Sequence, residues 1–394
     1  MFVKRKILPL LKTYLSAPEA LVLTGFRRVG KSTLVKHIFD HLETDNKVFL
    51  DMESPVSQKI FQEENYDAIA TRLSKLGITM KGRVPYVFMD EIQYVREIPS
   101  IVKYLFDHYR IKFVLTGSSS FYLKHHFTES LAGRKFLFEL MPLDFEEFLW
   151  FKGEKLSLDA DYDLLRHLYD EFMQFGGLPG VVLEPDAVGK QLRLDDALGS
   201  YFQLDVVNLS SFRNIKVLKS LLFLLAPRVG TRLDITKLSE NLGVSRQTLY
   251  NYLEFFEQTY LIHLVPAYSH SHDVITRKVP KLYFVDSGIF GRVGTASEGQ
   301  LFEQTVFRQL LTTSYFHHPG ETLPPRVNYF QKKSGAEIDF IVGDKGYEVK
   351  LAGSKSDVAR LARFTKHLNL SAYVVISLEK TRHDGGDMVY PFSL

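Results

Sequence analysis

The amino-acid sequence predicts an α/β protein whose N-terminal core is a parallel sheet wound with helices. Short apolar runs at residues 20–24, 47–51, 85–91 and 111–115 have the length and composition of buried parallel strands. Apolar residues at helical spacing follow the first run, so a strand and a helix alternate there. A chain of 394 residues has room for roughly two to four domains, each with a core of its own.

The composition is that of an ordinary folded protein. Hydrophobic residues make up 45% and charged residues 24% of the sequence, which excludes a disordered tail protein and a fibrous repeat. The lack of cysteine excludes a disulfide framework, a thiol nucleophile and a Cys-ligated metal, and it suits a reducing cytosol. No apolar run approaches the roughly 18 residues that span a bilayer, and Lys12 interrupts the apolar start of the chain. We therefore expect a cytoplasmic protein with no membrane partner and no signal peptide.

Charge is uneven along the chain, although the net charge is only +3. Residues 151–205 carry 5 basic and 11 acidic side chains, whereas residues 206–292 carry 11 basic and 6 acidic ones. Such asymmetry predicts separate modules, and turn-forming residues at 176–180 break the acidic stretch. We therefore expect an N-terminal domain at 1–150, an acidic helical connector, a basic module and a C-terminal domain at 293–394.

A phosphate-binding loop follows the first strand directly. Residues 25–32 read Gly-Phe-Arg-Arg-Val-Gly-Lys-Ser, which is the complete pattern between a strand and a helix. The glycines let the backbone wrap around phosphate oxygens, and the helix N-terminus adds donor groups. We expect Lys31 to contact the β- and γ-phosphates and the Ser32 hydroxyl to bind Mg²⁺. The predicted nucleotide-binding residues of the loop are Gly25, Phe26, Arg27, Arg28, Val29, Gly30, Lys31, Ser32 and Thr33.

Two carboxylates end the strand at 85–91. A buried parallel strand would deliver Asp90 and Glu91 to the carboxyl edge of the sheet, where Mg²⁺ and water are needed. Asp90 would hold the Mg²⁺ shell, and Glu91 would orient or deprotonate the attacking water. An acidic pair that caps the next helix is the alternative, and the neighbouring loop favours the catalytic interpretation. Thr116 or Ser118, after the next strand, either senses the γ-phosphate or makes an ordinary turn.

A fifth strand is expected at residues 135–140, and Leu131 to Arg134 precede it. Arg134 is either an arginine finger or sensor, or a plain surface arginine. No signature for guanine recognition occurs in a suitable place, so we expect the nucleotide to be ATP.

The basic module contains a helix-turn-helix pattern. Residues 234–245 predict a short helix, a glycine turn and an N-cap, and a longer helix follows with Leu249, Leu253, Phe256 and Tyr260 on one face. Two further apolar runs, 262–265 and 281–285, could form a wing. The exposed side of the longer helix, which would face DNA bases, carries Arg246, Gln247, Tyr250 and Asn251. Packing of this module against the ATPase or a partner protein is the open alternative, and the basic charge favours DNA.

The C-terminal domain carries a possible metal site. Glu303 shares a helix face with apolar residues and is therefore expected to point inward. Strands at 337–342 and 347–351 flank a turn, and pairing of Val342 with Tyr347 would place Asp339 opposite Lys350. Glu348 would share that face, so the carboxylates could bind Mg²⁺ while Lys350 positions a water or stabilises charge. The alternative is a cross-strand salt bridge on a solvent face.

The chain as a whole resembles the prokaryotic family of AAA-type, STAND-like P-loop ATPases that carry a C-terminal winged helix and a PD-(D/E)xK nuclease-like domain. The residues that carry the resemblance are the loop at 25–32, Met89 to Glu91, Leu115 to Ser119, Leu131 to Arg134, Gly176 to Pro179, Val285 to Gly288 and the C-terminal acidic set. The resemblance implies an ATPase domain at 1–150, a connector or lid at 151–205, a winged helix at 206–292 and a nuclease-like domain at 293–394. It also implies that Glu303, Asp339, Glu348 and Lys350 fill the nuclease motif, with Ile338 in place of the usual proline.

These patterns lead to one expected function and two alternatives. The expected function is an Mg²⁺-dependent ATPase whose nucleotide state controls a C-terminal half that binds DNA and, in the stronger form, cleaves it. The first alternative is an ATP-driven switch with an inert nuclease-like interaction domain. The second is a DNA-binding regulator. A protein partner and an oligomer are compatible with all three.

Overall fold

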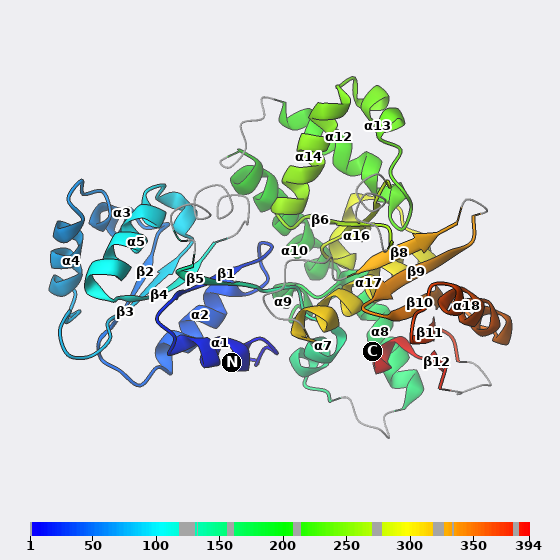
Figure 1. Cartoon of the computed structure of the whole chain (residues 1–394), viewed down its shortest axis with the longest axis horizontal. Coiled ribbons are helices and arrows are strands. Elements are labelled where there is room, and N and C mark those ends of the chain that lie inside the picture. The colour runs from blue at the N-terminus through cyan, green and yellow to red at the C-terminus, as the bar shows by residue number, and fades with distance from the viewer. Residues whose placement is uncertain are drawn as a thin grey trace. The chain divides into compact units, whose positions relative to one another are not determined.

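The computed structural model describes residues 2–117, 131, 133–155, 161–207, 214–269, 278–317, 327–332, 335–380 and 386–394. The chain divides into two compact units (Figure 1). Unit 1 and unit 2 each contain a cluster of buried hydrophobic residues. Unit 1 contains residues 1–141, 203–210 and 258–260, and unit 2 contains the rest. The division into four domains stays a prediction. No helix in the described parts of the chain has the length and apolar composition that crossing a bilayer requires.

Unit 1 is built on a five-stranded parallel sheet, as the sequence predicts. Its strands are β1 (Ala20–Thr24), β2 (Lys47–Asp51), β3 (Tyr86–Asp90), β4 (Lys112–Thr116) and β5 (Lys135–Glu139). The strand order is β2-β3-β4-β1-β5, and every pairing is parallel. The carboxyl ends of β1, β3 and β4 therefore meet at one edge. The helices of unit 1 are α1 (Leu8–Leu15), α2 (Lys31–Asp40), α3 (Pro55–Ile60), α4 (Tyr66–Lys75), η1 (Ile92–Tyr94) and α5 (Ile98–Tyr109).

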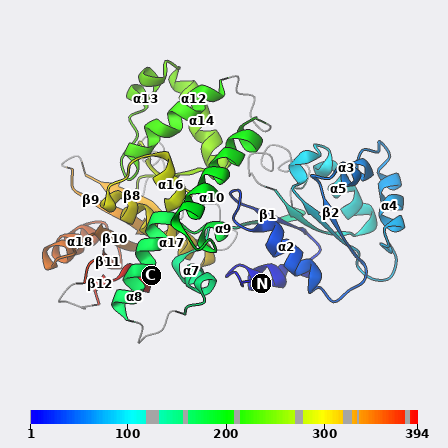
Figure 2. The same ribbon diagram turned by 180° about the vertical axis from the view of Figure 1, so that it is seen from behind.

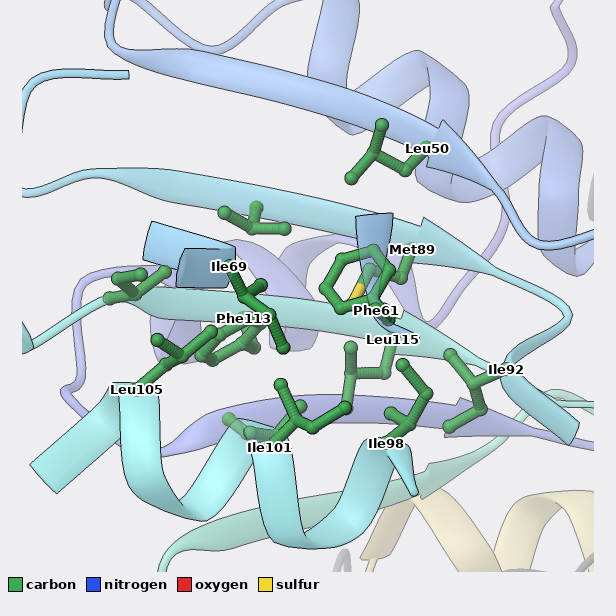
Figure 3. Packing of buried hydrophobic residues seen from close by; sticks show 14 of the residues in the cluster. Leu50, Phe61, Ile69, Met89, Ile92, Ile98, Ile101, Leu105, Phe113 and Leu115 are labelled. Atoms are coloured by element: carbon green, nitrogen blue, oxygen red, sulfur yellow. The ribbon is translucent and has the colours of Figure 1, made fainter. Parts of the chain in front are cut away.

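Apolar side chains cover the sheet of unit 1 on both faces, as a parallel sheet requires. On one face, Ile101 and Leu105 of α5 point toward Phe113 of β4, and all three are fully buried (Figure 3). On the other face, Leu34 and Val35 of α2 are equally buried. This core fixes the strand ends that carry the site.

Unit 2 combines helices with two smaller sheets (Figure 2). Its first helices are α7 (Phe145–Lys152), α8 (Tyr162–Phe175), α9 (Pro179–Val182) and α10 (Ala187–Ser200). A π-helical segment, η2 (Tyr201–Val206), continues α10, and its residues from Gln203 on belong to unit 1. Next come α12 (Ile215–Leu225), η3 (Ala226–Arg228), α13 (Ile235–Leu242), α14 (Arg246–Gln258), the antiparallel strands β6 (Ile262–Val265) and β7 (Lys281–Phe284), α16 (Ser287–Val293) and α17 (Glu298–His317). A mixed sheet of order β12-β11-β10-β9-β8 ends the chain. Its elements are β8 (Asn328–Gln331), β9 (Glu337–Val342), β10 (Lys345–Lys350), α18 (Lys355–His367), β11 (Ala372–Ser377), β12 (Met388–Val389) and η4 (Pro391–Ser393).

Two of the resemblance motifs meet in unit 2 and have a structural role. Asp286 caps α16, and its Oδ2 also accepts a hydrogen bond of 2.7 Å from the backbone N–H of Gly177, just after α8. A Cβ on Gly176 would lie 1.9 Å from the Asp286 carboxylate, so glycine is required there. Burial raises the pKa of Asp286, while these backbone donors oppose that shift. The glycine turn at 176–177 and the aspartate cap thus tie α8 to α16.

The predicted register of the C-terminal hairpin is wrong by two residues. Val342 pairs with Lys345 rather than Tyr347, because the turn contains only Gly343 and Asp344. Gly343 has φ 58°, a left-handed conformation that a tight two-residue turn needs. Tyr347 pairs with Phe340. Continuing this register by one residue places Asp339 opposite Glu348. A shift of two residues keeps every side chain on its predicted face.

The predicted longer helix of the basic module ends earlier than expected. Leu249, Leu253 and Phe256 are buried, as predicted, but α14 ends at Gln258. Tyr260 lies beyond the helix with φ 62°, which is unusual for a bulky side chain. Its ring therefore does not belong to the helical face.

Candidate nucleotide site and carboxylate cluster

The phosphate-binding loop joins β1 to α2 in unit 1. Gly25 has φ 138°, and a Cβ there would lie 2.1 Å from the carbonyl oxygen of Leu140. Gly30 has φ 96° and occupies the N-cap of α2 without a capping side chain, so the first backbone N–H groups of the helix remain for a ligand. Arg5, which sequence reasoning missed, donates 2.8 Å from Nη1 to the carbonyl of Val29. Arg5 therefore fixes the backbone of the loop, while the backbone N–H groups at the start of α2 remain as donors.

Lys31 lies inside the loop. Its Nζ donates to the carbonyls of Gly25 at 2.9 Å and Phe26 at 3.0 Å, and the residue is 5% exposed. Burial lowers the pKa of Lys31, and the charge of Glu91 is the main opposing influence. The ammonium group is thus placed where the loop would hold phosphate oxygens.

Asp90 and two hydroxyls meet at the carboxyl edge of the sheet. Thr116 Oγ1 donates to Asp90 Oδ1. Burial raises the pKa of Asp90, and hydrogen bonds from Thr116 and Ser32 act in the opposite direction. A carboxylate beside the Ser32 hydroxyl is a donor set that suits Mg²⁺, which prefers oxygen ligands and keeps several waters. The two predicted Mg²⁺ residues are therefore together.

Glu91 has an unusual backbone and a fixed side chain. Its φ of 52° is left-handed, its N–H donates 3.0 Å to Thr116 Oγ1, and Gln93 Nε2 donates 2.5 Å to its Oε2. The Glu91 side chain makes no capping hydrogen bond to η1, the helix that follows it. The alternative in which this acidic residue caps the next helix is therefore not observed for Glu91. Strained residues of this kind cluster at functional sites. Gln93 was not predicted from the sequence.

Within unit 1, two residues from far along the chain contact the loop and the strand before it. Arg27 Nε donates to Asp205 Oδ2, and Thr24 Oγ1 shares a 2.6 Å hydrogen bond with the Tyr260 hydroxyl. Asp205 is 1% exposed. No sequence pattern signals either contact, because the partners are 178 and 236 positions apart.

The remaining residues that were predicted for the ATP site either lie on the surface or fall outside the described residues. Arg134 Nε donates 2.9 Å to Asp107 Oδ1, and each of these side chains is 36% exposed, so Arg134 forms a surface ion pair in its own chain. Thr33 is exposed on α2. Ser118, Ser119 and Ala132 lie outside the described residues.

The predicted DNA-reading side chains lie on the solvent side of α14. Arg246, Gln247, Tyr250 and Asn251 are exposed, and Gln247 Nε2 donates 3.0 Å to Asn251 Oδ1. Arg246 and Tyr250 line a cavity of about 500 Å³ together with Arg232. The module thus presents two guanidinium groups and an exposed ring at one place.

Glu303 makes a hydrogen bond and an ion pair that were not predicted from the sequence. Its Oε1 accepts a 2.6 Å hydrogen bond from the Tyr283 hydroxyl and lies 3.7 Å from Lys281 Nζ. Lys281 is 2% exposed and also lies 3.4 Å from Glu337 Oε1. Burial, followed by the charge of Asp339, raises the pKa of Glu303 to about 7. We call Glu303, Glu337, Asp339 and Glu348 the carboxylate cluster.

The other end of the carboxylate cluster is also paired with cations. Glu348 Oε1 lies 2.8 Å from Lys350 Nζ and 2.5 Å from Arg360 Nη2, and Asp339 Oδ2 accepts 2.8 Å from the backbone N–H of Val349. Burial and the charge of Asp339 raise the pKa of Glu348 to about 7. Glu348 Oε2 is buried and has no hydrogen-bond partner. Among the residues that the structure describes, no group of three or more His, Cys, Asp or Glu is arranged to hold a metal ion.

Comparison with known proteins identifies the N-terminal domain. The description "AAA domain" matches residues 17–149, and domains of unknown function, DUF8612 and DUF4143, match 166–299 and 298–394. The uncharacterized protein MJ1544 of Methanocaldococcus jannaschii is 30% identical over 338 residues, which cover 83% of this chain and 73% of that protein. An uncharacterized protein of Haemophilus influenzae is 26% identical over 327 residues, 79% of each chain.

Comparison with solved structures finds two ATPases from Pyrococcus species. The Walker-type ATPase paby2304 of Pyrococcus abyssi has 17% identity and a TM-score of 0.47, with 74% of this chain and 96% of that chain covered. The STAND protein PH0952 of Pyrococcus horikoshii has 14% identity and a TM-score of 0.31, with 80% and 46% covered.

Proposed function

The chain belongs to the same family as the MJ1544 protein and has an AAA-type, P-loop ATPase-like domain at residues 17–149, and on that premise we propose that it binds and hydrolyses ATP with Mg²⁺. The observation that carries the proposal is the convergence of Lys31, Asp90 and Glu91 at one edge of the parallel sheet. Ser32 and Asp90 would hold Mg²⁺, which neutralises phosphate charge when bound.

The protein's own groups divide the remaining work. Lys31 and the N-terminus of α2 bind the phosphates, since both direct donors into the loop. The Glu91 carboxylate orients the attacking water or accepts its proton. Thr116 positions both acidic residues, because its hydroxyl bonds the Asp90 carboxylate and the Glu91 backbone.

Two substitutions test this activity. Lys31→Ala should abolish ATP binding measured by calorimetry, because the loop loses its cation. Glu91→Gln should keep binding and reduce turnover by at least about 100-fold, because the amide cannot accept a proton. Lys36→Ala is the matched control, since Lys36 is exposed on the same helix and pairs with Asp40. Wild-type protein that is folded but neither binds nor hydrolyses ATP would refute the proposal.

We further propose that nucleotide state controls a DNA-binding C-terminal half. The exposed Arg246 and Tyr250 beside the cavity support this, since guanidinium groups bind phosphates and base edges and exposed rings stack on bases. Duplex DNA binding, measured by fluorescence anisotropy, should differ between ATP and ADP. Arg246→Ala should weaken DNA binding by about 1–3 kcal/mol, whereas Lys216→Ala, at an exposed position of α12, should change it little. No binding in either nucleotide state would refute this part.

The carboxylate cluster supports the inert form of the nuclease-like domain more than the cleaving form. Lys281 already supplies a cation among the carboxylates, whereas the unpartnered Glu348 Oε2 is the one feature that favours a metal ligand. Supercoiled DNA with Mg²⁺ or Mn²⁺ decides between them. Cleavage by wild type that Asp339→Ala and Lys350→Ala both abolish would establish the nuclease. Equal cleavage by all three proteins would mean contamination or another site, and no cleavage by wild type would favour an interaction domain.

A further inference from the structure

A buried ion pair connects the phosphate-binding loop to the π-helical segment of unit 1. Arg27 Nε donates to Asp205 Oδ2, and the two side chains are only 12% and 2% exposed. A buried ion pair is weak evidence for stability, because desolvation offsets most of its attraction. Stability alone therefore does not account for a buried ion pair at this position beside the phosphate-binding loop.

The Arg27 guanidinium lies in the field of two carboxylates. Burial acts to lower the pKa of Arg27, but the charge and hydrogen bond of Asp205 and the charge of Glu91 act in the opposite direction, and the net pKa is raised. Asp205 also acts on the buried Lys31. Asp205 and Glu91 thus compete for one cation next to the proposed reaction centre.

Asp205 is delivered to this place by an irregular backbone. Residues 201–206 form a π-helix that follows α10 without a break. π-Helical turns are rare and occur frequently at functional sites, because the wider turn redirects side chains. The wider π-helical turn therefore accounts for the direction in which the Asp205 side chain leaves the backbone.

We propose that Asp205 is a positioning residue for ATP hydrolysis, which holds the Arg27 guanidinium away from Glu91. The inference rests on the proposed ATPase function. With Asp205 charged, Arg27 stays paired with Asp205. The Glu91 carboxylate then remains able to accept a proton from water. Without that charge, the Glu91 carboxylate still attracts Arg27, and an ion pair between them neutralises the base.

The test compares steady-state ATP hydrolysis by full-length variants. Asp205→Asn should lower kcat at least about tenfold, since loss of a general base costs about 100-fold or more when complete, while KM stays within about twofold. Asp205→Glu should restore most of the rate because it keeps the charge. In the Arg27→Gln background, Asp205→Asn should cause no further loss, because the guanidinium that would pair with Glu91 is absent. Asp195→Asn, an exposed carboxylate of α10 that pairs with Arg292, is the control.

The outcomes separate this inference from the function on which it rests. Thermal unfolding of each variant is measured alongside, and rates are compared below the lowest midpoint. Equal loss of kcat from Asp205→Asn with and without Arg27 would show a structural role and overturn the inference. An active wild type with an unchanged Asp205→Asn variant would overturn it too, while the ATPase would stand. A folded wild type without ATPase activity would refute both.

Discussion

Replacing Lys281 with methionine should destabilise unit 2, and more so at pH 8 than at pH 5. Lys281 Nζ lies 3.7 Å from Glu303 Oε1 and 3.4 Å from Glu337 Oε1, and its side chain is 2% exposed. Burial acts to lower the pKa of Lys281, but Glu303, Asp339 and Glu337 raise it, so the residue is a cation in the folded chain. Methionine keeps an unbranched chain of similar length and removes the charge that these carboxylates share.

The expected loss of unfolding free energy follows from the distances between Lys281 and its two carboxylate partners. At an effective dielectric constant of about 20, two charges 3.4–3.7 Å apart attract by roughly 4–5 kcal/mol. The desolvation of the buried ammonium offsets part of this attraction, but removal of one partner leaves the other charges uncompensated, which costs about 3–5 kcal/mol. We expect that loss at pH 8. The pKa of Glu303 is already about 7 in the presence of the lysine. At pH 5 this carboxyl is protonated in the variant, so the loss should fall below about 2 kcal/mol.

The sequence provides a local probe for this measurement. Its one tryptophan, Trp150, lies in α7 of unit 2, so tryptophan fluorescence during urea unfolding reports on that unit. Lys355→Met, at an exposed position of α18, is the matched control and should cost less than about 0.5 kcal/mol. A loss below about 1 kcal/mol at pH 8, or an equal loss at both pH values, would refute the reasoning.

Three further predictions concern the wild type and the nucleotide site. Glu303 and Glu348 have pKa values of about 7 when folded against the usual 4.5, so the folded chain binds more protons in that window and the stability of unit 2 should fall as pH rises from about 5 to 8; a rise in the fluorescence-detected midpoint would contradict this. Thr116→Val should reduce ATP turnover about tenfold or more, because it leaves buried polar partners unsatisfied at about 1–3 kcal/mol; unchanged kcat would contradict it. Gly25→Ala should abolish nucleotide binding, because its Cβ would clash with a backbone oxygen at 2.1 Å; normal affinity by calorimetry would contradict it.

Most of unit 1 could be predicted because its signals are local. The loop at 25–32 lies between a buried strand and a helix in adjacent sequence, and the five predicted strands differ from the observed ones by about one residue at their ends. Asp205 could not be predicted in the same way. Its partner Arg27 is 178 positions away, and no periodic pattern in one sequence records such a contact.

The errors in unit 2 come from turns and helix ends. Tyr260 follows Phe256 at a helical spacing of four, so periodicity alone extended the helix, whereas α14 ends at Gln258. The hairpin error has a similar origin, because Gly343 supports a turn of two residues as readily as a longer one. The even shift preserved the shared face of Asp339 and Glu348, which is why the cluster could still be recognised.

Glu303 is a half-buried carboxylate, with 23% of its side chain exposed, on an apolar face of its helix. An inward carboxylate on an apolar helix face must have a cationic or hydrogen-bonding partner, because an isolated buried charge is too costly. The sequence established that need and suggested a metal ion as the partner. The structure instead supplies Lys281 and the Tyr283 hydroxyl, both from β7 and both separated from Glu303 by a stretch of helix and turn with no periodic link to it. A lysine inside an apolar strand is itself a buried charge that needs a partner. Because Lys281 and Glu303 have opposite signs and each needs such a partner, pairing them satisfies both at once, which favours this ion pair over a metal ion.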